Sequence, residues 1–282
     1  MSRTDELHLE EPFRTLWAGK DAFAEVRALR GTVLRELEGR RTLRFELAGR
    51  GYYAKLHRGV GWSEIVKNLL VARLPALGAE QEWRAIRRLT QLGVPTMSAV
   101  AYGRRGTNPA RIESFIITEE LAPTISLEDF CRDWPAQPPT PTLKRALIAR
   151  VAGMTATMHQ GGINHRDCYI CHFLLHLPVD AAAPRLSLID LHRAQLRAGA
   201  APRRWRNKDL AALHFSSLEI GLTARDRLRF LRAYFGHPLR RILAEEAALL
   251  ARLERDGRRL ATRYQRKFAS REGSPGAAGG RP

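Results

Sequence analysis

The chain has 282 residues, 44% of them hydrophobic, which is enough for one large core or two modest ones and excludes a peptide-sized role. Its 47 Lys and Arg against 29 Asp and Glu give a formal charge of +18, which indicates an anionic partner: nucleic acid, a phospholipid surface or a phosphorylated substrate. Residues 1–11 are acidic and lack the apolar core of a signal peptide, and no apolar run is long enough to span a membrane. We therefore expect a cytoplasmic protein with three reduced cysteines.

The first 120 residues predict a small sheet with one helix. Residues 33–57 alternate between apolar and polar and contain a glycine turn, which is typical of three consecutive strands. After Gly78, apolar residues recur at helical spacing up to a stop signal at residues 93–95. Two further strands are expected around residues 98–102 and 114–118, so the pattern is mixed α+β.

The rest of the chain predicts mainly helices. A proline-rich connector at residues 137–141 precedes a helix whose apolar stripe runs from Leu147 to Met158 and which ends at a glycine pair. Two short strands follow, and then three helices are expected over residues 210–218, 224–235 and 239–268. We predict a two-lobed fold: an antiparallel-sheet lobe over residues 1–121, a helical lobe over residues 122–268, and a disordered Gly- and Pro-rich tail over residues 269–282.

Residues 165–172, His-Arg-Asp-Cys-Tyr-Ile-Cys-His, admit four interpretations. His-Arg-Asp after a long helix is typical of the catalytic loop of a kinase, with Asp190 after the next apolar strand as the ligand of nucleotide-bound Mg²⁺. Cys-x-x-Cys-His is also the attachment site of a c-type haem, but that chemistry requires export, so we expect no haem. A zinc site has suitable ligand types but unusual spacing, and buried apolar cysteines are the simplest alternative.

The order of four further features favours the kinase interpretation, and the first of them is that Asp190 follows Asp167 by 23 residues, far enough for a short hairpin between base and metal ligand. Lys55 lies on the third predicted strand, where a kinase places the lysine that binds the ATP phosphates, and Glu82 begins the next helix, where it can pair with that lysine. Glu119 and Leu121 lie directly after an apolar strand, where a hinge would offer backbone groups to adenine. No Gly-x-x-x-x-Gly-Lys-Ser/Thr run occurs, which excludes a P-loop nucleotide site.

Over nearly its whole length the sequence resembles the lipopolysaccharide core kinases of Gram-negative bacteria, of the Kdo/heptose kinase type, and most closely the heptose(I) kinases. Beyond the catalytic run, the resemblance rests on residues 11–13, 16–17, 40–45, 67–70, 114–119, 123–128, 192–196, 203–206 and 208–210. It implies a protein-kinase-like fold and transfer of the ATP γ-phosphate to a hydroxyl, O4, of the first heptose of the inner core. The resemblance also implies that this reaction takes place at the cytoplasmic face of the inner membrane.

Carried over by position, the resemblance implies that Asp167 is the catalytic base, Lys55 the phosphate-binding lysine, Glu82 its partner and Asp190 the Mg²⁺ ligand. Three departures from the protein-kinase pattern follow from the sequence. His172 stands where an Asn usually binds a second metal ion, residues 191–192 replace the usual Phe-Gly, and Gly39 is the only glycine between the first two strands. We therefore expect either that His172 is a ligand of this second metal ion or that only one Mg²⁺ is held, and we expect Arg40 and Arg41 to neutralise part of the phosphate charge.

The resemblance also explains the excess of basic residues, because the lipid A and sugar-acid parts of such an acceptor are anionic, and so is the inner-membrane surface. We expect the arginines that follow Asp190 to line the acceptor side of the cleft, namely Arg193, Arg197, Arg203, Arg204 and Arg206. The basic helix expected at residues 244–268 either lies on the membrane or packs on the helical lobe.

Three other functions stay open from the sequence: a related kinase acting on Kdo, one acting on protein, and a basic nucleic-acid-binding protein. The sequence contains no recognised nucleic-acid-binding motif, so we expect no nucleic-acid partner. The need for a helper protein is also open.

Overall fold

The structure is a computed structural model that describes residues 5–37, 39–59, 78–108, 110–256, 259 and 262. Residues 269–282, expected to be a disordered tail, lie outside the described residues. Residues 67–70, on which part of the family resemblance rests, also lie outside them. Within the described residues, no helix is long and apolar enough to cross a membrane.

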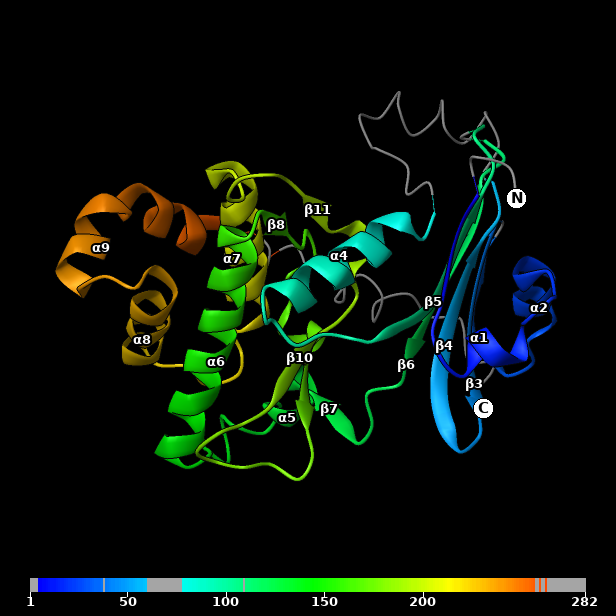
Figure 1. Ribbon diagram of the computed structural model, residues 1–282. Coiled ribbons are helices and arrows are strands. Elements are labelled where there is room, and N and C mark those ends of the chain that lie inside the picture. The colour runs from blue at the N-terminus through cyan, green and yellow to red at the C-terminus, as the bar shows by residue number, and fades with distance from the viewer. Residues whose placement is uncertain are drawn as a thin grey trace, which may run out of the picture.

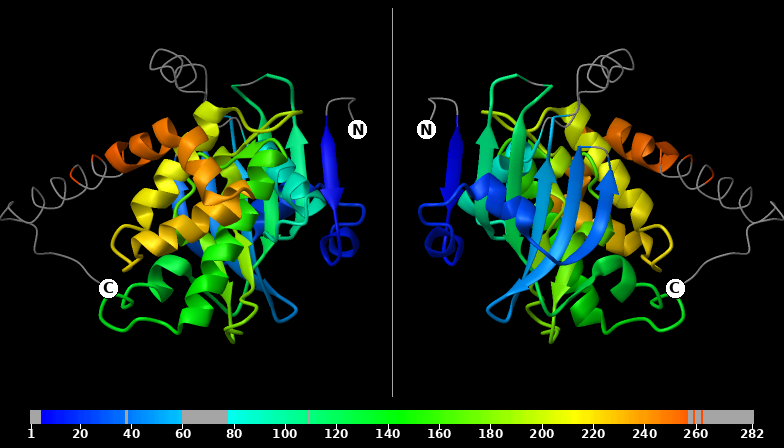
Figure 2. Two further views of the ribbon diagram at one scale, coloured as in Figure 1. Left: turned by 90° about the vertical axis from the view of Figure 1, so that its left-hand side faces the viewer. Right: turned by 90° about the vertical axis from the view of Figure 1, so that its right-hand side faces the viewer.

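The N-terminal part of the chain forms an antiparallel sheet of six strands in the order β1-β5-β6-β4-β3-β2. The strands are β1 (Glu6–Leu9), β2 (Thr32–Leu37), β3 (Arg40–Leu47), β4 (Arg50–His57), β5 (Ala99–Arg105) and β6 (Glu113–Glu119). Five of these strands agree with the prediction. The sixth, β1, was not predicted, because its four residues are too few to show a period. It completes one edge of the sheet by pairing with β5 (Figure 2).

Helices cover both faces of this sheet. Two short helices, α1 (Phe13–Leu16) and α2 (Ala22–Ala28), lie on the outer face and enclose an aromatic core in which the Phe13 and Tyr52 rings meet edge to face (Figure 1). On the inner face lies α4 (Glu80–Gln91), which ends before the predicted stop at Gly93. Trp83 of α4 stacks on Tyr102 of β5 at 5.0 Å between ring centroids, which fixes this helix against the sheet.

The C-terminal part is mainly helical. Its helices are α5 (Leu127–Phe130), α6 (Pro141–Gln160), α7 (Arg203–Ser216), α8 (Ala224–Phe235) and α9 (Leu239–Glu245). Its short strands are β7 (Thr124–Ser126), β8 (Ile163–Asn164), β9 (Phe173–His176), β10 (Leu186–Leu188) and β11 (Gln195–Leu196), with the 3-10 turns η1 (Ile170–His172) and η2 (Leu191–Arg193) between them. One apolar core runs without interruption from α4 through α6 to β9 and β10. We propose that the two lobes divide at Leu121, between β6 and β7.

The last predicted helix differs from the structure. One continuous helix over residues 239–268 was expected, but α9 ends at Glu245, and helix resumes over residues 247–256. The turn at Glu246 points its carboxylate at Arg203 and Arg206 of α7, each at 3.1 Å. Leu249, just beyond the turn, packs into a small core with α6, α7 and α8. Most of residues 257–268 lie outside the described residues.

Candidate active site

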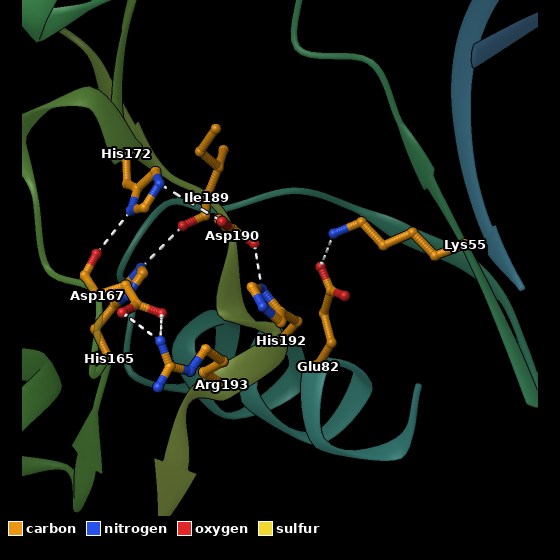
Figure 3. A network of polar contacts seen from close by, with 9 residues as sticks. All are labelled: Lys55, Glu82, His165, Asp167, His172, Ile189, Asp190, His192 and Arg193. Atoms are coloured by element: carbon orange, nitrogen blue, oxygen red, sulfur yellow. Dashed lines mark hydrogen bonds and ion pairs between the residues drawn. The ribbon is translucent and has the colours of Figure 1, made fainter. Parts of the chain in front are cut away.

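A buried ion pair joins the sheet to α4. Lys55 of β4 donates from Nζ to Oε1 of Glu82 at 2.6 Å, and the Glu82 side chain is only 1% exposed (Figure 3). The second carboxylate oxygen, Oε2, is buried and has no hydrogen-bond partner among the described residues. A buried carboxylate of this kind fixes the lysine ammonium in one place. The structure therefore brings together the two residues whose pairing the sequence predicted.

Asp167 lies in the loop that follows β8, and two side chains define its surroundings. Arg193 of η2 donates from one guanidinium nitrogen to both Asp167 carboxylate oxygens, at 2.8 and 2.9 Å. The backbone carbonyl of Asp167 accepts a hydrogen bond from Nδ1 of His172 at 2.7 Å. Because Nδ1 donates there, a neutral His172 ring carries its free lone pair on Nε2.

Asp190 faces this loop from the other side of the cleft in a left-handed conformation, with φ 63° and ψ 54°. Its carboxylate accepts from Nδ1 of His192 at 2.5 Å and lies 3.5 Å from Nε2 of His172. Burial raises the pKa of Asp190, but the His192 hydrogen bond and the charges of His192, Lys55 and His172 outweigh it. The net result is a pKa well below the usual range. Asp190 is therefore a permanently ionised carboxylate in the cleft.

Asp209, which sequence reasoning missed, holds the catalytic loop in shape. This α7 residue is fully buried and accepts the backbone N–H groups of His165 at 2.6 Å and Arg166 at 2.8 Å. His159 of α6 lies 3.2 Å from the same carboxylate and 2.7 Å from the Tyr234 hydroxyl of α8. The only sequence signal was a lone carboxylate beside an apolar helical stripe.

His165 links the two halves of the site. Its Nε2 donates to the carbonyl of Ile189 at 2.9 Å, directly before Asp190, and its ring stacks on His172 at 5.4 Å between centroids. Burial lowers the pKa of His165, so the ring is neutral and serves as a fixed strut. The loop around Asp167 and the turn around Asp190 are thus tied to each other.

The register of β3 and β4 separates the two arginines expected at the phosphates. Arg40 lies opposite His57 and Arg41 opposite Leu56, while Thr42 lies opposite Lys55. Since side chains alternate between faces, Arg40 shares the Lys55 face and Arg41 lies on the opposite one. Nε of Arg40 is buried without a hydrogen-bond partner in the described part of the chain. Gly39, at the turn before β3, has φ 74°.

The segment after β6 has the form expected of a hinge. The Glu119 N–H donates to Ser98 at 2.9 Å and the Glu120 N–H to Gly51 at 2.9 Å, whereas the Leu121 N–H makes no backbone hydrogen bond within the described ranges. The Glu120 carboxylate accepts two hydrogen bonds from Arg44, at 2.9 and 2.8 Å. Glu119 and Glu120 therefore anchor this segment to the sheet, while the Leu121 N–H has no backbone partner in the described ranges.

The arginines that follow Asp190 divide into separate groups. Arg203 and Arg206 pair with Glu246, whereas Arg204 lies over the Trp205 ring. Arg193 alone contacts the carboxylate of Asp167. The sequence placed these four and Arg197 on the acceptor side of the cleft. Because Arg203 and Arg206 have a partner within the helical lobe, we keep only Arg193, Arg197 and Arg204 as acceptor-side candidates.

Of the two cysteines in residues 168–172, Cys168 is part of the core and Cys171 is partly buried. Cys168 is fully buried among apolar side chains, and burial raises the pKa of its thiol well above the ordinary value. Burial likewise raises the pKa of Cys171 to about 11. Within the described residues, no group of three or more His, Cys, Asp and Glu side chains is placed to hold a metal ion by itself.

A model of the lipopolysaccharide kinase (Kdo/WaaP) family matches residues 24–234. The chain belongs to this family. It is 65% identical over 262 residues to the lipopolysaccharide core heptose(I) kinase WaaP of Pseudomonas aeruginosa, covering 92% of this chain and 97% of that protein. It is 58% identical over 263 residues to the protein of the same name from Escherichia coli strain K12, covering 93% and 99%.

A solved structure of a family member agrees with this fold. The structure of WaaP in complex with acyl carrier protein matches with a TM-score of 0.81 and 60% identity, covering 90% of this chain and 99% of that one. The chain therefore has the predicted protein-kinase-like fold of a small antiparallel-sheet lobe and a mainly helical lobe. It is an ATP-dependent phosphotransferase.

Proposed function

We propose that the chain transfers the γ-phosphate of ATP to O4 of the first heptose of the lipopolysaccharide inner core. The relatives' names support the heptose acceptor. The observation that carries the proposal is the convergence of the Lys55–Glu82 pair, Asp167 and Asp190 on one cleft from different elements of the chain (Figure 3). Those are the groups that phosphoryl transfer needs: fixed cations, a base and a metal-binding carboxylate.

The nucleotide occupies the sheet side of the cleft in this proposal. The Leu121 N–H, two residues after Glu119 and without a backbone partner among the described residues, donates to adenine. Lys55 binds the α- and β-phosphates, held in place by Glu82. Arg40 adds a second cation on the same face, and its orphaned Nε is suited to a phosphate oxygen. We assign this role to Arg40 rather than Arg41, because only Arg40 shares a face with Lys55.

The donor groups near Asp190 fit Mg²⁺. In its neutral form, His172 presents the Nε2 lone pair 3.5 Å from the Asp190 carboxylate, so that both groups can ligate one cation. Mg²⁺ in kinases takes only one or two protein carboxylates, with phosphate oxygens completing its shell, so a larger protein site is unnecessary. Asp190 would hold the ion and His172 would support it. Bound there, Mg²⁺ neutralises charge on the ATP phosphates.

Asp167 acts on the acceptor. Its carboxylate accepts the proton of the attacking hydroxyl as the oxygen–phosphorus bond forms and the bond between the γ-phosphorus and the leaving ADP oxygen breaks. Arg193 orients this carboxylate through its two hydrogen bonds. The Arg193 side chain is 45% exposed, so its remaining N–H groups face the entering acceptor or the transferred phosphoryl group.

We further propose that the chain works in the cytoplasm, at the anionic inner-membrane surface. The formal charge of +18 suits an anionic surface.

We also propose that the chain binds an acyl carrier protein. The related WaaP was solved in complex with acyl carrier protein. An apolar cavity of about 380 Å³ in the helical lobe, lined by Leu127, Leu147, Leu213, Phe230 and Leu250 among others, fits an acyl chain. A higher melting temperature with acylated carrier than with unacylated carrier supports this proposal; equal melting temperatures contradict it.

The acceptor position is tested by incubating the protein with Mg-ATP and heptose-containing core lipopolysaccharide that lacks phosphate, and locating the new phosphate by two-dimensional NMR. We expect the phosphorus signal to correlate with H4 of the first heptose. Correlation with another heptose position removes the O4 assignment. Phosphate found only on Kdo or on protein removes the heptose assignment.

A further inference from the structure

Four cations gather around one indole ring beside the catalytic loop. The distances to the centroid of the Trp205 ring are 4.6 Å from Nζ of Lys208, 5.1 Å from the Arg204 guanidinium carbon, and 5.9 Å from those of Arg166 and Arg197. These residues come from three separate parts of the chain: α7, the Asp167 loop and the end of β11. We call them, with Trp205, the Trp205 cluster.

The cations of this cluster have no ion-pair partner among the described residues: none of the four lies within 4 Å of a carboxylate oxygen. The Arg197 guanidinium donates to the neutral amide oxygens of Asn164 and Gln195. Burial and the nearby Arg193 charge lower the pKa of Arg166 by more than the carboxylates of Asp167 and Asp209 raise it. The positive charge of the cluster is therefore available to a ligand.

The same helix shows the contrasting case one position away. Arg203 and Arg206 of α7 both pair with Glu246 at 3.1 Å, so the fold does supply a carboxylate where arginines only hold helices together. In the Trp205 cluster the cations contact an indole ring in place of a carboxylate. A ring attracts cations through its electron-rich face and leaves their charge and most of their N–H donors free. Four like charges at such distances repel one another, and a bound anion relieves the repulsion.

The cluster is continuous with the proposed acceptor side of the active site. Arg166 directly precedes Asp167 in the chain, and Arg193 is hydrogen-bonded to the Asp167 carboxylate. A path of cations thus leads from the base, through Arg193 and Arg166, to the exposed side chains of Arg204 and Lys208. Because the cluster adjoins the base, an anionic group bound at the cluster would belong to the same acceptor molecule as the hydroxyl that receives the phosphoryl group.

We propose that the Trp205 cluster is a binding subsite for an anionic group, carboxylate or phosphate, carried by the acceptor saccharide next to the sugar that receives the phosphoryl group. The inference rests on the proposed function for the identity of the acceptor. It adds the residues that select an anionic acceptor: Arg166, Arg197, Arg204 and Lys208 around Trp205. Each guanidinium has planar donors suited to carboxylate or phosphate oxygens, and Lys208 adds a point charge.

The test compares a double variant, Arg204→Gln with Lys208→Gln, against Arg203→Gln as the matched control on the same helix. All three side chains lie at the surface, so each variant should fold, and thermal unfolding checks this. The probe is heptose-containing core oligosaccharide freed of its lipid. We expect the double variant to raise the KM for this probe by about tenfold or more, while the KM for ATP and kcat stay within about twofold. Arg203→Gln should change the acceptor KM by less than about twofold.

Chemical removal of the acceptor charge distinguishes the two anions. Amidation of the oligosaccharide carboxylates should raise the wild-type KM and abolish the difference between wild type and double variant. If amidation has no effect, but the double variant discriminates against lipid-linked acceptor with intact phosphates, the bound anion is a phosphate. Equal acceptor KM values for wild type and double variant with both acceptors overturn the subsite.

Binding without turnover separates this proposal from the proposed function. Calorimetric titration of the same oligosaccharide into the proteins needs no phosphoryl transfer. Weaker binding by the double variant supports the subsite even if wild type phosphorylates another group. If the oligosaccharide and the lipid-linked acceptor each bind wild type and double variant equally, the subsite fails whatever the reaction is.

Discussion

At the residue scale, Asp209 is the side chain on which the geometry of the catalytic loop most depends. It is fully buried and accepts two backbone N–H groups directly before Asp167, so the loop in its present shape, together with His159, satisfies its charge. His159 connects it to Tyr234, which extends the same network to α8. A residue that contacts no substrate thereby positions the base.

Replacing Asp209 by Asn should disrupt this arrangement, because an amide has one acceptor oxygen and brings N–H donors toward N–H donors. We expect the free energy of unfolding to fall by about 2–4 kcal/mol and kcat to fall by at least about tenfold. Urea unfolding and steady-state kinetics measure both. Asp180→Asn, in an exposed loop, is the control and should cost less than about 0.5 kcal/mol. Wild-type stability and turnover in Asp209→Asn would refute the positioning role.

At the element scale, α8 carries Tyr234 and begins with a capping box. The Thr223 hydroxyl accepts the Asp226 N–H at 3.2 Å, and the Asp226 carboxylate accepts the Thr223 N–H at 3.1 Å. Lys144 of α6 also pairs with Asp226 at 3.1 Å, so this helix start is tied to the neighbouring helix. The cap therefore bears on how α8 packs against α6.

Thr223→Ala removes half of the capping box. We expect a loss of about 1 kcal/mol in the free energy of unfolding with kcat unchanged, because Tyr234 lies at the far end of the helix. Chemical denaturation followed by circular dichroism measures the loss, and Thr223→Ser, which keeps the hydroxyl, should recover most of it. An equal loss in the Ser variant would show that the methyl packing, not the cap, is what matters.

The sequence could predict the elements whose periodicity is unbroken and could not predict those set by distant partners. The strands β3 and β4 and the helices α4 and α6 follow from alternation or helical spacing. The strand β1 and the helices α1 and α2 are too short to show a period. The break at Glu246 interrupts a pattern that continues on both sides, and at this break Glu246 pairs with two arginines of α7.

The same division holds in the site. The order of motifs along the chain was enough to predict that Lys55, Glu82, Asp167 and Asp190 share one site, because each follows a recognisable strand or helix. Which of Arg40 and Arg41 faces the cleft depends on strand register, which the sequence did not determine. The pairing of Arg203 with Glu246, and the loop-holding role of Asp209, arise from contacts between segments more than 40 residues apart.

At the scale of the whole molecule, buried neutral histidines make the fold sensitive to acid. Burial, together with the charges of Arg40, Lys55 and His192, lowers the pKa of His57 to about 3. Between that value and the ordinary pKa of about 6.5, the unfolded chain binds a proton at this position and the folded chain does not. Stability therefore rises with pH across this window and is lost as the pH falls through it.

His57→Gln should remove this contribution. Between pH 7 and pH 5, wild type should lose about 2 kcal/mol more free energy of unfolding than the variant does. Urea unfolding of both proteins at the two pH values gives the difference directly. Parallel losses in the two proteins would mean that His57 is already protonated in the folded state or exchanges its proton freely with water.

The proposed phosphoryl transfer depends on Asp167 as the base. The most direct measurement follows labelled γ-phosphate from Mg-ATP to phosphate-free, heptose-containing core lipopolysaccharide, and compares wild type with Asp167→Ala. We predict that wild type labels the lipopolysaccharide and that the variant does so at least about 10²-fold more slowly, while it still binds ATP. A variant that labels the acceptor as fast as wild type would contradict Asp167 as the base. A wild type that uses ATP but never labels this acceptor would contradict the proposed function.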